Sequence, residues 1–178
     1  MRFLSSTLFL VIACSLPLHA EDWPSYLHDA ARSGVTSERL TMPLHEQWTF
    51  KAPHAPCPAW PPPAKQDFWH EIRELKPVVT YDRAYHTVIA EGRLYFATTS
   101  DDQVYCLDAA AGERRWTFYA EAPIRLAPAI AGGKVYFGSD DGWVYCLTAG
   151  EGTLCWKQRP VPEDRRYPGN GRVISSTP

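Results

Sequence analysis

An internal repeat constrains this chain of 178 residues more than any other feature. Residues 92–96 (GRLYF) return as 133–137 (GKVYF), and residues 104–107 (VYCL) return unchanged as 144–147. The offset is 41 residues in the first pair and 40 residues in the second. One extra residue within 98–100 explains this change, because a difference in length is tolerated best in a turn.

Each repeat unit has the composition of several short strands. β-branched, aromatic and small apolar residues dominate residues 93–98 and 103–108, which predicts strands that are buried on both faces. In the second unit, Asp140-Asp141-Gly142 predicts a two-residue primed hairpin turn, since glycine supplies a positive φ. A period of about 40 residues with four short strands is typical of a propeller blade. We therefore expect an all-β fold, a β-propeller of four-stranded antiparallel blades, with only about two blades and a closing strand present.

A glycine and a tryptophan recur at the end of each unit. Gly112 precedes Trp116 by four residues, and Gly152 precedes Trp156 by the same interval. A Trp at a fixed place is best explained as a docking anchor, because its side chain covers the largest apolar area and blades bury their faces only against neighbouring blades. The expected docking anchors are Trp48, Trp116 and Trp156, and the expected turn formers are Gly112, Gly142 and Gly152.

The residues of the repeat also resemble a known family. The pattern Gly-x-Val/Leu-Tyr-Phe, Val-Tyr-Cys-Leu-x-Ala and Gly-x-x-x-Trp is similar to the repeat of the PQQ-like (pyrroloquinoline-quinone-type) β-propellers. This superfamily includes quinoprotein alcohol dehydrogenases and the propeller lipoprotein of the outer-membrane β-barrel assembly machinery. Residues 22–34 are similar to the start of exported PQQ-like repeat proteins. The resemblance spans residues 22–178 and implies that an early strand at 44–50, which contains Trp48, completes the last blade of the ring.

The chain begins with the features of an export signal. Arg2 gives a positive start, residues 3–13 form an apolar run that is too short to span a bilayer, and residues 18–20 offer a small-residue cleavage site. We expect cleavage after Ala20, export to the periplasm or cell envelope, and no transmembrane helix in the mature chain. The alternative is a lipoprotein box in which Cys14 becomes the lipidated first residue.

The sequence divides the chain into seven segments. We expect a signal peptide at 1–20, an N-terminal segment with the ring-closing strand at 21–50, a Pro- and aromatic-rich insertion at 51–86, a first blade at 87–119, a second blade at 120–159, a loop insertion at 160–172 and the truncated start of a third blade at 173–178. Because two blades cannot close a ring, we expect a fragment of a longer protein or a ring completed by other chains.

The insertion at 51–86 is the segment in which individual function is most expected. Trp60 and Trp69 are candidates for a binding surface, and a short helix is predicted at 66–75. The alternative use of these aromatic residues is a cap over one end of the propeller.

The charge balance excludes one class of partner. The chain has 18 Lys and Arg against 20 Asp and Glu, and loss of Arg2 with the signal leaves 17 against 20, a net charge of −3. Nucleic-acid partners need clustered Lys and Arg, and no basic stripe is present in the sequence. We expect a protein or another envelope component as the partner.

Four cysteines remain after cleavage. Equivalent positions of adjacent blades lie about 10 Å apart, beyond the span of about 7 Å between Cα atoms that a disulfide tolerates. We therefore interpret Cys106 and Cys146 as small buried apolar residues. Cys155 is expected to point to the face opposite Trp156, and a bond between Cys155 and Cys57 stays open.

The sequence leads to two hypotheses about function. The first is an exported non-catalytic scaffold or protein-binding module, with no catalytic, cofactor-binding or metal-binding residue predicted. The alternative is a fragment of a PQQ-dependent quinoprotein dehydrogenase, with PQQ and calcium held mostly by missing blades. The resemblance to that subfamily implies a disulfide between adjacent cysteines over the cofactor, and this chain has no two adjacent cysteines.

Overall fold

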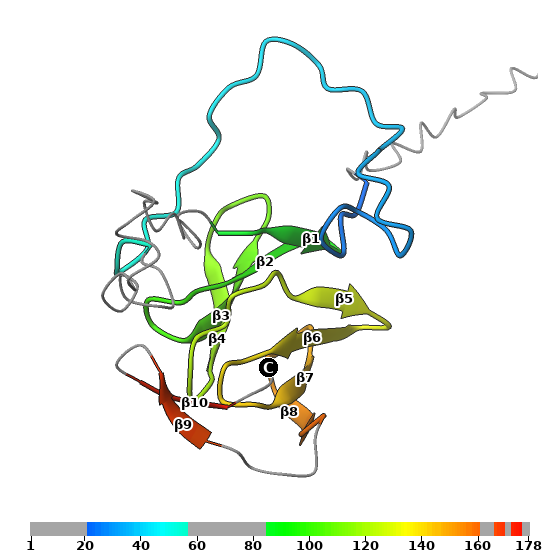
Figure 1. Ribbon diagram of the computed structural model, residues 1–178. Helices are drawn as coiled ribbons and strands as arrows, with labels where there is room; N and C mark the ends of the chain where they lie inside the picture. The colour runs from blue at the N-terminus through cyan, green and yellow to red at the C-terminus, as the bar shows by residue number, and fades with distance from the viewer. Residues whose placement is uncertain (1–20, 57–84, 161–165, 170–171, 176–178) are drawn as a thin grey trace, which may run out of the picture.

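Two four-stranded antiparallel sheets form the body of the molecule. The computed structural model describes residues 21–56, 85–160, 166–169 and 172–175. The first sheet contains, in sequence order, β1 (Val88–Ala90), β2 (Arg93–Ala97), β3 (Gln103–Asp108) and β4 (Arg114–Tyr119). The second contains β5 (Ala129–Ala131), β6 (Lys134–Gly138), β7 (Val144–Thr148) and β8 (Leu154–Gln158), and a separate pair is formed by β9 (Arg166–Gly169) and β10 (Arg172–Ser175) (Figure 1).

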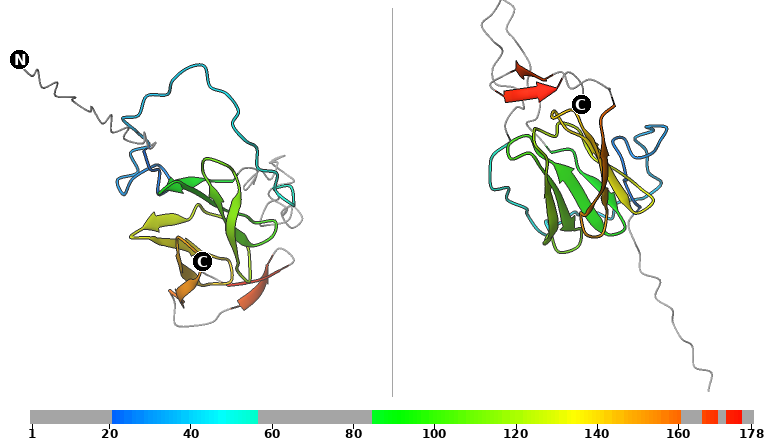
Figure 2. Two further views of the ribbon diagram at one scale, coloured as in Figure 1. Left: turned by 180° about the vertical axis from the view of Figure 1, so that it is seen from behind. Right: turned by 90° about the horizontal axis from the view of Figure 1, so that it is seen from below.

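The two large sheets lie side by side as neighbouring propeller blades (Figures 1 and 2). Each runs in simple up-and-down order, and the first strands, β1 and β5, approach one another. This arrangement confirms the expected all-β class with four-stranded antiparallel blades. In the parts of the chain that are described, no helix is long and apolar enough to cross a membrane.

Two-residue primed turns occur at a different hairpin from the one that was predicted. Glu91 and Gly92 join β1 to β2 with φ values of 52° and 70°, and Gly132 and Gly133 join β5 to β6 with 55° and 69°. Positive φ at both central residues defines this turn type. The prediction for Asp140-Asp141-Gly142 was therefore wrong in turn type and right about positive φ at Gly142.

The turn between β6 and β7 is a three-residue loop. The amide of Ser139 donates to the carbonyl of Trp143 across 3.1 Å, and Gly142, with φ 85°, is the position in the left-handed region. In the first sheet, Ala97 pairs with Val104, and in the second Gly138 pairs with Val144. The loop between the paired residues is one residue longer in the first sheet. The predicted extra residue of the first unit is thereby confirmed.

Both sheets have a bulge in their last hairpin. Cys106 pairs with Trp116 and Leu107 with Arg114, so Arg115 is an extra residue on β4. The same shift occurs in the second sheet, where Cys146 pairs with Trp156 and Leu147 with Leu154. A bulge sets two residues against one and interrupts the alternation of faces.

The bulge in the second sheet changes the expected direction of Cys155. This residue is the extra one on β8, and its thiol interacts with that of Cys146, which is paired with Trp156. The prediction that Cys155 points away from the face of Trp156 was therefore wrong, because it assumed an unbroken strand.

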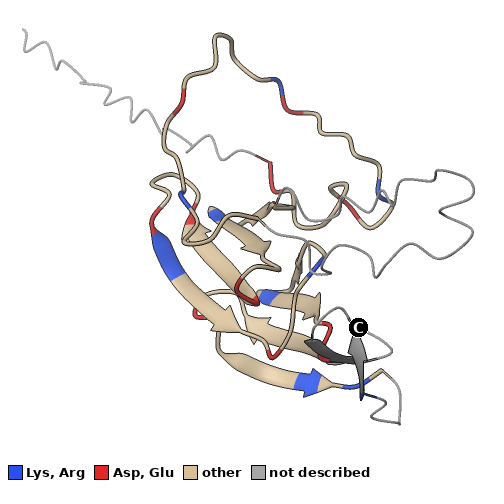
Figure 3. Cartoon of the chain, turned by 60° about the vertical axis from the view of Figure 1, so that its left-hand side comes forward, with Lys and Arg blue, Asp and Glu red and all other residues tan. Residues whose placement is uncertain are grey.

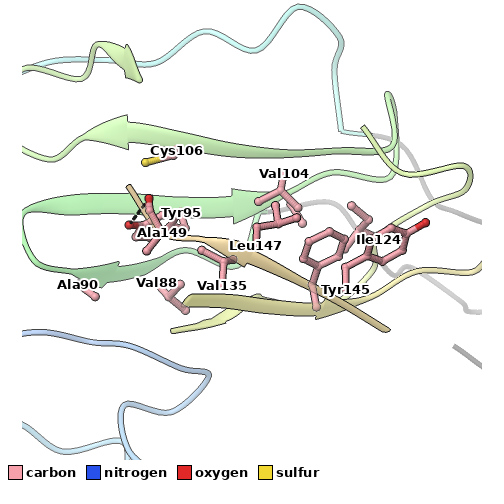
Figure 4. Packing of buried hydrophobic residues seen from close by; sticks show 12 residues of the cluster. Val88, Ala90, Tyr95, Val104, Cys106, Ile124, Val135, Tyr145, Leu147 and Ala149 are labelled. Carbon is pink, nitrogen blue, oxygen red and sulfur yellow. Dashed lines mark hydrogen bonds between the residues drawn. The ribbon is translucent and has the colours of Figure 1, made fainter. Parts of the chain in front are cut away.

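The main core lies between the two sheets (Figure 4). Tyr95, Val104 and Cys106 of the first sheet meet Val135 and Leu147 of the second, and all five are at most 1% exposed. The strand β3 is buried on both faces, as predicted. Cys106 and Cys146 are buried and free, as expected for small apolar residues.

A second core covers the other face of the first sheet. Phe96, Tyr105 and Leu107 pack there against Trp48 and Phe50. The rings of Phe96 and Tyr105 are stacked, with centroids 5.0 Å apart. Apolar contacts therefore hold Trp48 and Phe50 on the blade.

The predicted strand at 44–50 is not formed. These residues pair with no strand of the part of the chain that is described. The physical reason is that an outer strand needs the inner strands of its own blade to pair with. Each of the two large described sheets already has its own four strands.

The expected irregular loop at 160–172 contains a strand. Within it, β9 pairs with β10, and Gly169 is opposite Arg172. The two residues between them in the sequence, Asn170 and Gly171, form a dipeptide that strongly favours a hairpin, and this signal was missed. The predicted helix at 66–75 lies outside the described residues. So do the signal peptide, most of the insertion at 51–86 and residues 176–178.

Candidate functional site

A tryptophan of one segment docks on a glycine turn of the first blade. The indole nitrogen of Trp48 donates to the carbonyl of Ala109 across 3.0 Å. A Cβ atom built on Gly112 would lie 2.5 Å from the Trp48 ring, closer than any real Cβ contact. The ring therefore occupies the space that a side chain at position 112 would need.

The same contact joins the two blades. Trp116 of β4 donates from its indole nitrogen to the carbonyl of Ala149 across 3.0 Å, and a Cβ on Gly152 would lie 2.6 Å from its ring. Gly152 has a φ of 68°, which side chains rarely adopt. Each glycine thus forms the turn of its own blade and also receives the tryptophan of the preceding segment.

Trp156 is in the equivalent place on β8. Its centroid lies 6.1 Å from that of Tyr136, much as Trp116 lies 5.9 Å from Tyr95. Yet Trp156 is 42% exposed. The face of the second blade that contains Tyr136 and Trp156, which we call the outward flank, has no blade against it among the described residues.

Carboxylates hold the hairpin loops at the other end of the blades. The hydroxyl of Tyr105 donates to Asp101 across 2.5 Å, and that of Tyr145 donates to Asp141 across 2.5 Å. Burial raises the pKa of both tyrosines, and the hydrogen bond to the carboxylate raises it further. The sequence signal for this pair was an Asp four residues before a Tyr in both units, which was interpreted only as a turn.

An ion pair connects the second loop to the segment between the blades. The guanidinium of Arg125 donates through Nε to Oδ1 of Asp140 across 2.8 Å. The other oxygen of Asp140 is buried and has no hydrogen-bond partner in the described structure. Ser139 adds a hydrogen bond of 2.9 Å to the carbonyl of Ala122. These polar groups fix the loop on the connecting segment. Figure 3 shows that Lys, Arg, Asp and Glu lie mainly in loops and at strand ends.

The N-terminal segment covers the inner edge of both blades. Trp23 and Ile89 exchange two backbone hydrogen bonds, of 2.7 and 2.9 Å, and the amide of Ile130 donates to the carbonyl of Pro24 across 2.8 Å. Residues 23 and 24 therefore connect β1 with β5.

A pocket of about 530 Å³ lies beside this segment. Tyr26, Arg32 and His86 are on one part of its wall, and Leu126 and Pro128 are on another. The rings of Tyr26 and His86 meet edge to face, with centroids 5.9 Å apart.

Residues 35–44 form an exposed arm that we call the arch. In Figure 1 this part of the chain curves away from both sheets before it returns to the first one. Its large apolar side chains are strongly exposed: Val35 66%, Leu40 70%, Met42 73% and Leu44 62%. Sequence reasoning missed the arch, although Leu40, Met42 and Leu44 stand at every second position, which is the period of a strand.

Several predicted residues lie outside the described part of the chain, namely Trp60, Trp69, Cys57 and Cys14. The structure brings Trp48 to Gly112 and Trp116 to Gly152, and it places Gly142 in a separate loop at the opposite end of the blade. Within the described ranges, no group of three or more His, Cys, Asp or Glu could hold a metal ion.

Comparison with known proteins gives one family match. Residues 46–174 match the family described as outer membrane protein assembly factor BamB. A quinoprotein ethanol dehydrogenase of Pseudomonas aeruginosa is 28% identical, over 61% of this chain and 20% of the relative. The dehydrogenase subunit of an alcohol dehydrogenase (quinone) of Gluconobacter oxydans is 33% identical, over 43% of this chain and 12% of the relative.

Among solved structures, a quinohemoprotein alcohol dehydrogenase from Comamonas testosteroni has a TM-score of 0.50 at 20% sequence identity. The match covers 81% of this chain and 20% of that chain, and it shows a common fold. The chain thus spans a fifth or less of the length of the relatives named here.

Proposed function

This chain belongs to the PQQ-like β-propeller family described as outer membrane protein assembly factor BamB, and from that membership we propose that it is an exported, non-catalytic scaffold. Its role is to bind another protein of the cell envelope. The observation that carries this proposal is the arch, a segment whose backbone curves away from both sheets and which has four strongly exposed apolar side chains.

The arch has the chemistry of a protein-binding segment. Large apolar side chains that stay exposed together mark interaction sites, because their burial by a partner removes apolar surface from water. The carboxylates of Asp101 and Asp141 at the loop end are already used within the blades, where they accept from Tyr105 and Tyr145. Binding through apolar contact therefore agrees better with the described residues than catalysis by converging polar groups.

The test uses a photo-crosslinking amino acid at Met42 of the full-length protein in intact cells. We expect a discrete adduct with one envelope protein. The same amino acid at Arg114, which is exposed on β4 and distant from the arch in sequence, serves as the control. The variant Val35→Ser, Leu40→Ser, Leu44→Ser should lower the yield of the Met42 adduct. Equal adducts at both positions, or none at Met42, would contradict the proposal.

The sequence relatives support a second candidate, a quinone-dependent dehydrogenase. In that case PQQ would supply the oxidising chemistry, and calcium would be bound beside it. The described residues do not fit this group: they contain no cluster of three carboxylate, His or Cys ligands, and residues 23 and 24 cover the inner edges of the two described blades. This candidate therefore needs residues outside the described ones, and we derive no catalytic step.

One assay separates the two candidates. Full-length protein is incubated with PQQ and calcium, and alcohol-dependent reduction of an artificial electron-accepting dye is measured. The scaffold proposal predicts no turnover above the protein-free control. Turnover that requires both PQQ and calcium would establish the dehydrogenase instead.

A further inference from the structure

Two cysteines meet at the bulge of the second blade. Cys155 is the extra residue of β8, between Leu154 and Trp156, and Trp156 is paired with Cys146 of β7. In such a bulge two successive residues lie opposite one residue of the neighbouring strand. Accordingly, the side chain of Cys155 helps to raise the pKa of the Cys146 thiol, after the larger effect of burial.

In the first blade, the position equivalent to Cys155 contains an arginine. Arg115 is the extra residue of β4 there, and it lies near Cys106, the equivalent of Cys146. Arg115 instead forms an ion pair of 2.6 Å with Asp108. The backbone geometry is common to both blades, whereas a pair of thiols occurs only in the second.

We propose that Cys146 and Cys155 form a disulfide that links β7 to β8. Residues opposite each other on antiparallel strands have Cα atoms about 4.5 to 5.5 Å apart, within the range that a disulfide spans. Both thiols are free in the structure, which shows the reduced form. The proposal goes beyond the scaffold function, and export to an oxidising compartment would favour the bond.

The exposed thiol begins the exchange. Cys155 is exposed and Cys146 is buried, and burial raises the pKa of the Cys146 thiol. Cys155 loses its proton to water and attacks one sulfur of a small disulfide such as oxidised glutathione, which releases one glutathione thiolate. Cys146 then loses its proton and attacks the sulfur of Cys155, which releases the second. Two protein thiols are oxidised, and one glutathione disulfide is reduced to two thiols.

The bond would fix the outermost strand beside the outward flank. Trp156 follows Cys155 directly, and all five residues of β8 are exposed. An outer strand with so little burial separates from its sheet easily. The disulfide holds β8 on β7 and thereby keeps the indole of Trp156 in place.

A single tryptic peptide contains both cysteines, so its mass shows whether the disulfide has formed. Cleavage by trypsin after Lys134 and Lys157 releases residues 135–157, which contain both cysteines. We expect the full chain, after incubation with oxidised glutathione, to give this peptide with a mass lower by two hydrogen atoms. Residues 94–114, which contain Cys106, should keep their mass after removal of any glutathione adduct by limited reduction.

Two variants make the test selective. Cys106→Ser removes the equivalent thiol of the first blade and should leave the mass change of 135–157 intact. Cys155→Ser, at an exposed position, should abolish the change. It should also abolish a rise of a few degrees in Tm between reduced and oxidised protein. A peptide 135–157 that stays reduced, or that is linked to the peptide of Cys57, would overturn the proposal whatever the outcome of the scaffold experiments.

Discussion

The indole of Trp116 determines how closely the two blades approach. Its nitrogen donates a hydrogen bond to the carbonyl of Ala149, and its ring packs against the backbone of Gly152. Both contacts come from one turn, so the ring is held by shape and by a hydrogen bond at the same place. Trp156 has the equivalent neighbour within its own blade and is exposed, whereas Trp116 is half-buried.

Truncation of these two tryptophans should therefore differ in cost. Trp116→Ala is expected to lower the free energy of unfolding by about 3 to 5 kcal/mol, because it opens a cavity between the blades. Trp156→Ala should cost about 1 kcal/mol in the same chain, since part of its ring is already in water. Urea unfolding of both variants gives the comparison. Equal losses would refute docking of Trp116 between the blades.

Gly152 should tolerate no side chain. Gly152→Ala is expected to cost at least about 2 kcal/mol, because it combines a positive φ with a collision against Trp116. Gly150→Ala is the matched control, since a Cβ there meets nothing within 4 Å. The measurement is the shift in thermal midpoint of each variant. A similar shift for both would mean that the close approach has no effect on stability.

The buried phenol of Tyr95 should make the folded chain less stable at high pH. Burial raises the pKa of Tyr95 from 10.0 to about 12. Since the folded state favours the neutral phenol, this stabilisation is complete below pH about 10 and is lost as the pH rises through about 12. The free energy of unfolding should fall as the pH rises across this window, and it should fall less steeply for the variant Tyr95→Phe. The same slope in both proteins would exclude Tyr95 as the source.

At the scale of elements, the loop between β6 and β7 is held to the blade by Asp141. This carboxylate accepts from the hydroxyl of Tyr145 and from the amide of Trp143, and the neighbouring Asp140 bonds Arg125. The loop is thus attached both to a strand of its own sheet and to the segment that arrives from the first sheet.

A double-mutant cycle measures the first of these attachments. Asp141→Ala and Tyr145→Phe should each destabilise the chain, and their effects should couple by about 1.5 to 3 kcal/mol, the range for a hydrogen bond to a charged group. Chemical unfolding of the two single variants and the double variant supplies the coupling energy. Additive effects would show that the bond contributes no net stability.

Elements were predictable where local pattern determines them. Repeated apolar runs located β2, β3, β6 and β7, and the repeated Gly and Trp marked the last hairpin of each blade. The bulge at Cys155 was not predictable, because strict alternation is the only rule that a strand pattern offers. The pairing of Asp101 with Tyr105 had a repeated signal, an Asp four residues before a Tyr, but the same Asp residues also fit a turn, and the sequence alone does not show that the two side chains meet.

At the scale of the whole molecule, the N-terminal segment joins the two blades. Residues 23 and 24 bond the amides of Ile89 on β1 and Ile130 on β5. The blades are therefore held together twice, at the inner edge by this segment and farther out by Trp116.

Removal of residues 21–34 should loosen the inner edge. We expect the amides of Ile89 and Ile130 to exchange hydrogen faster in the shortened chain, because their carbonyl acceptors are gone. The amide of Tyr105, in the middle of the first sheet, should keep most of its protection. Hydrogen exchange followed by mass spectrometry gives both rates. Unchanged exchange at Ile89 and Ile130 would contradict the assigned pairing.

The pairing of Trp23 and Pro24 with β1 and β5 also governs the order in which the chain can fold. Contacts between residues distant in sequence slow folding, because a long loop must close before they form. A chain that is synthesised from its N-terminus presents Trp23 long before Ile130 exists. The segment that is synthesised first is thus among the last to reach its place, and a chaperone that shields it in the meantime would speed maturation.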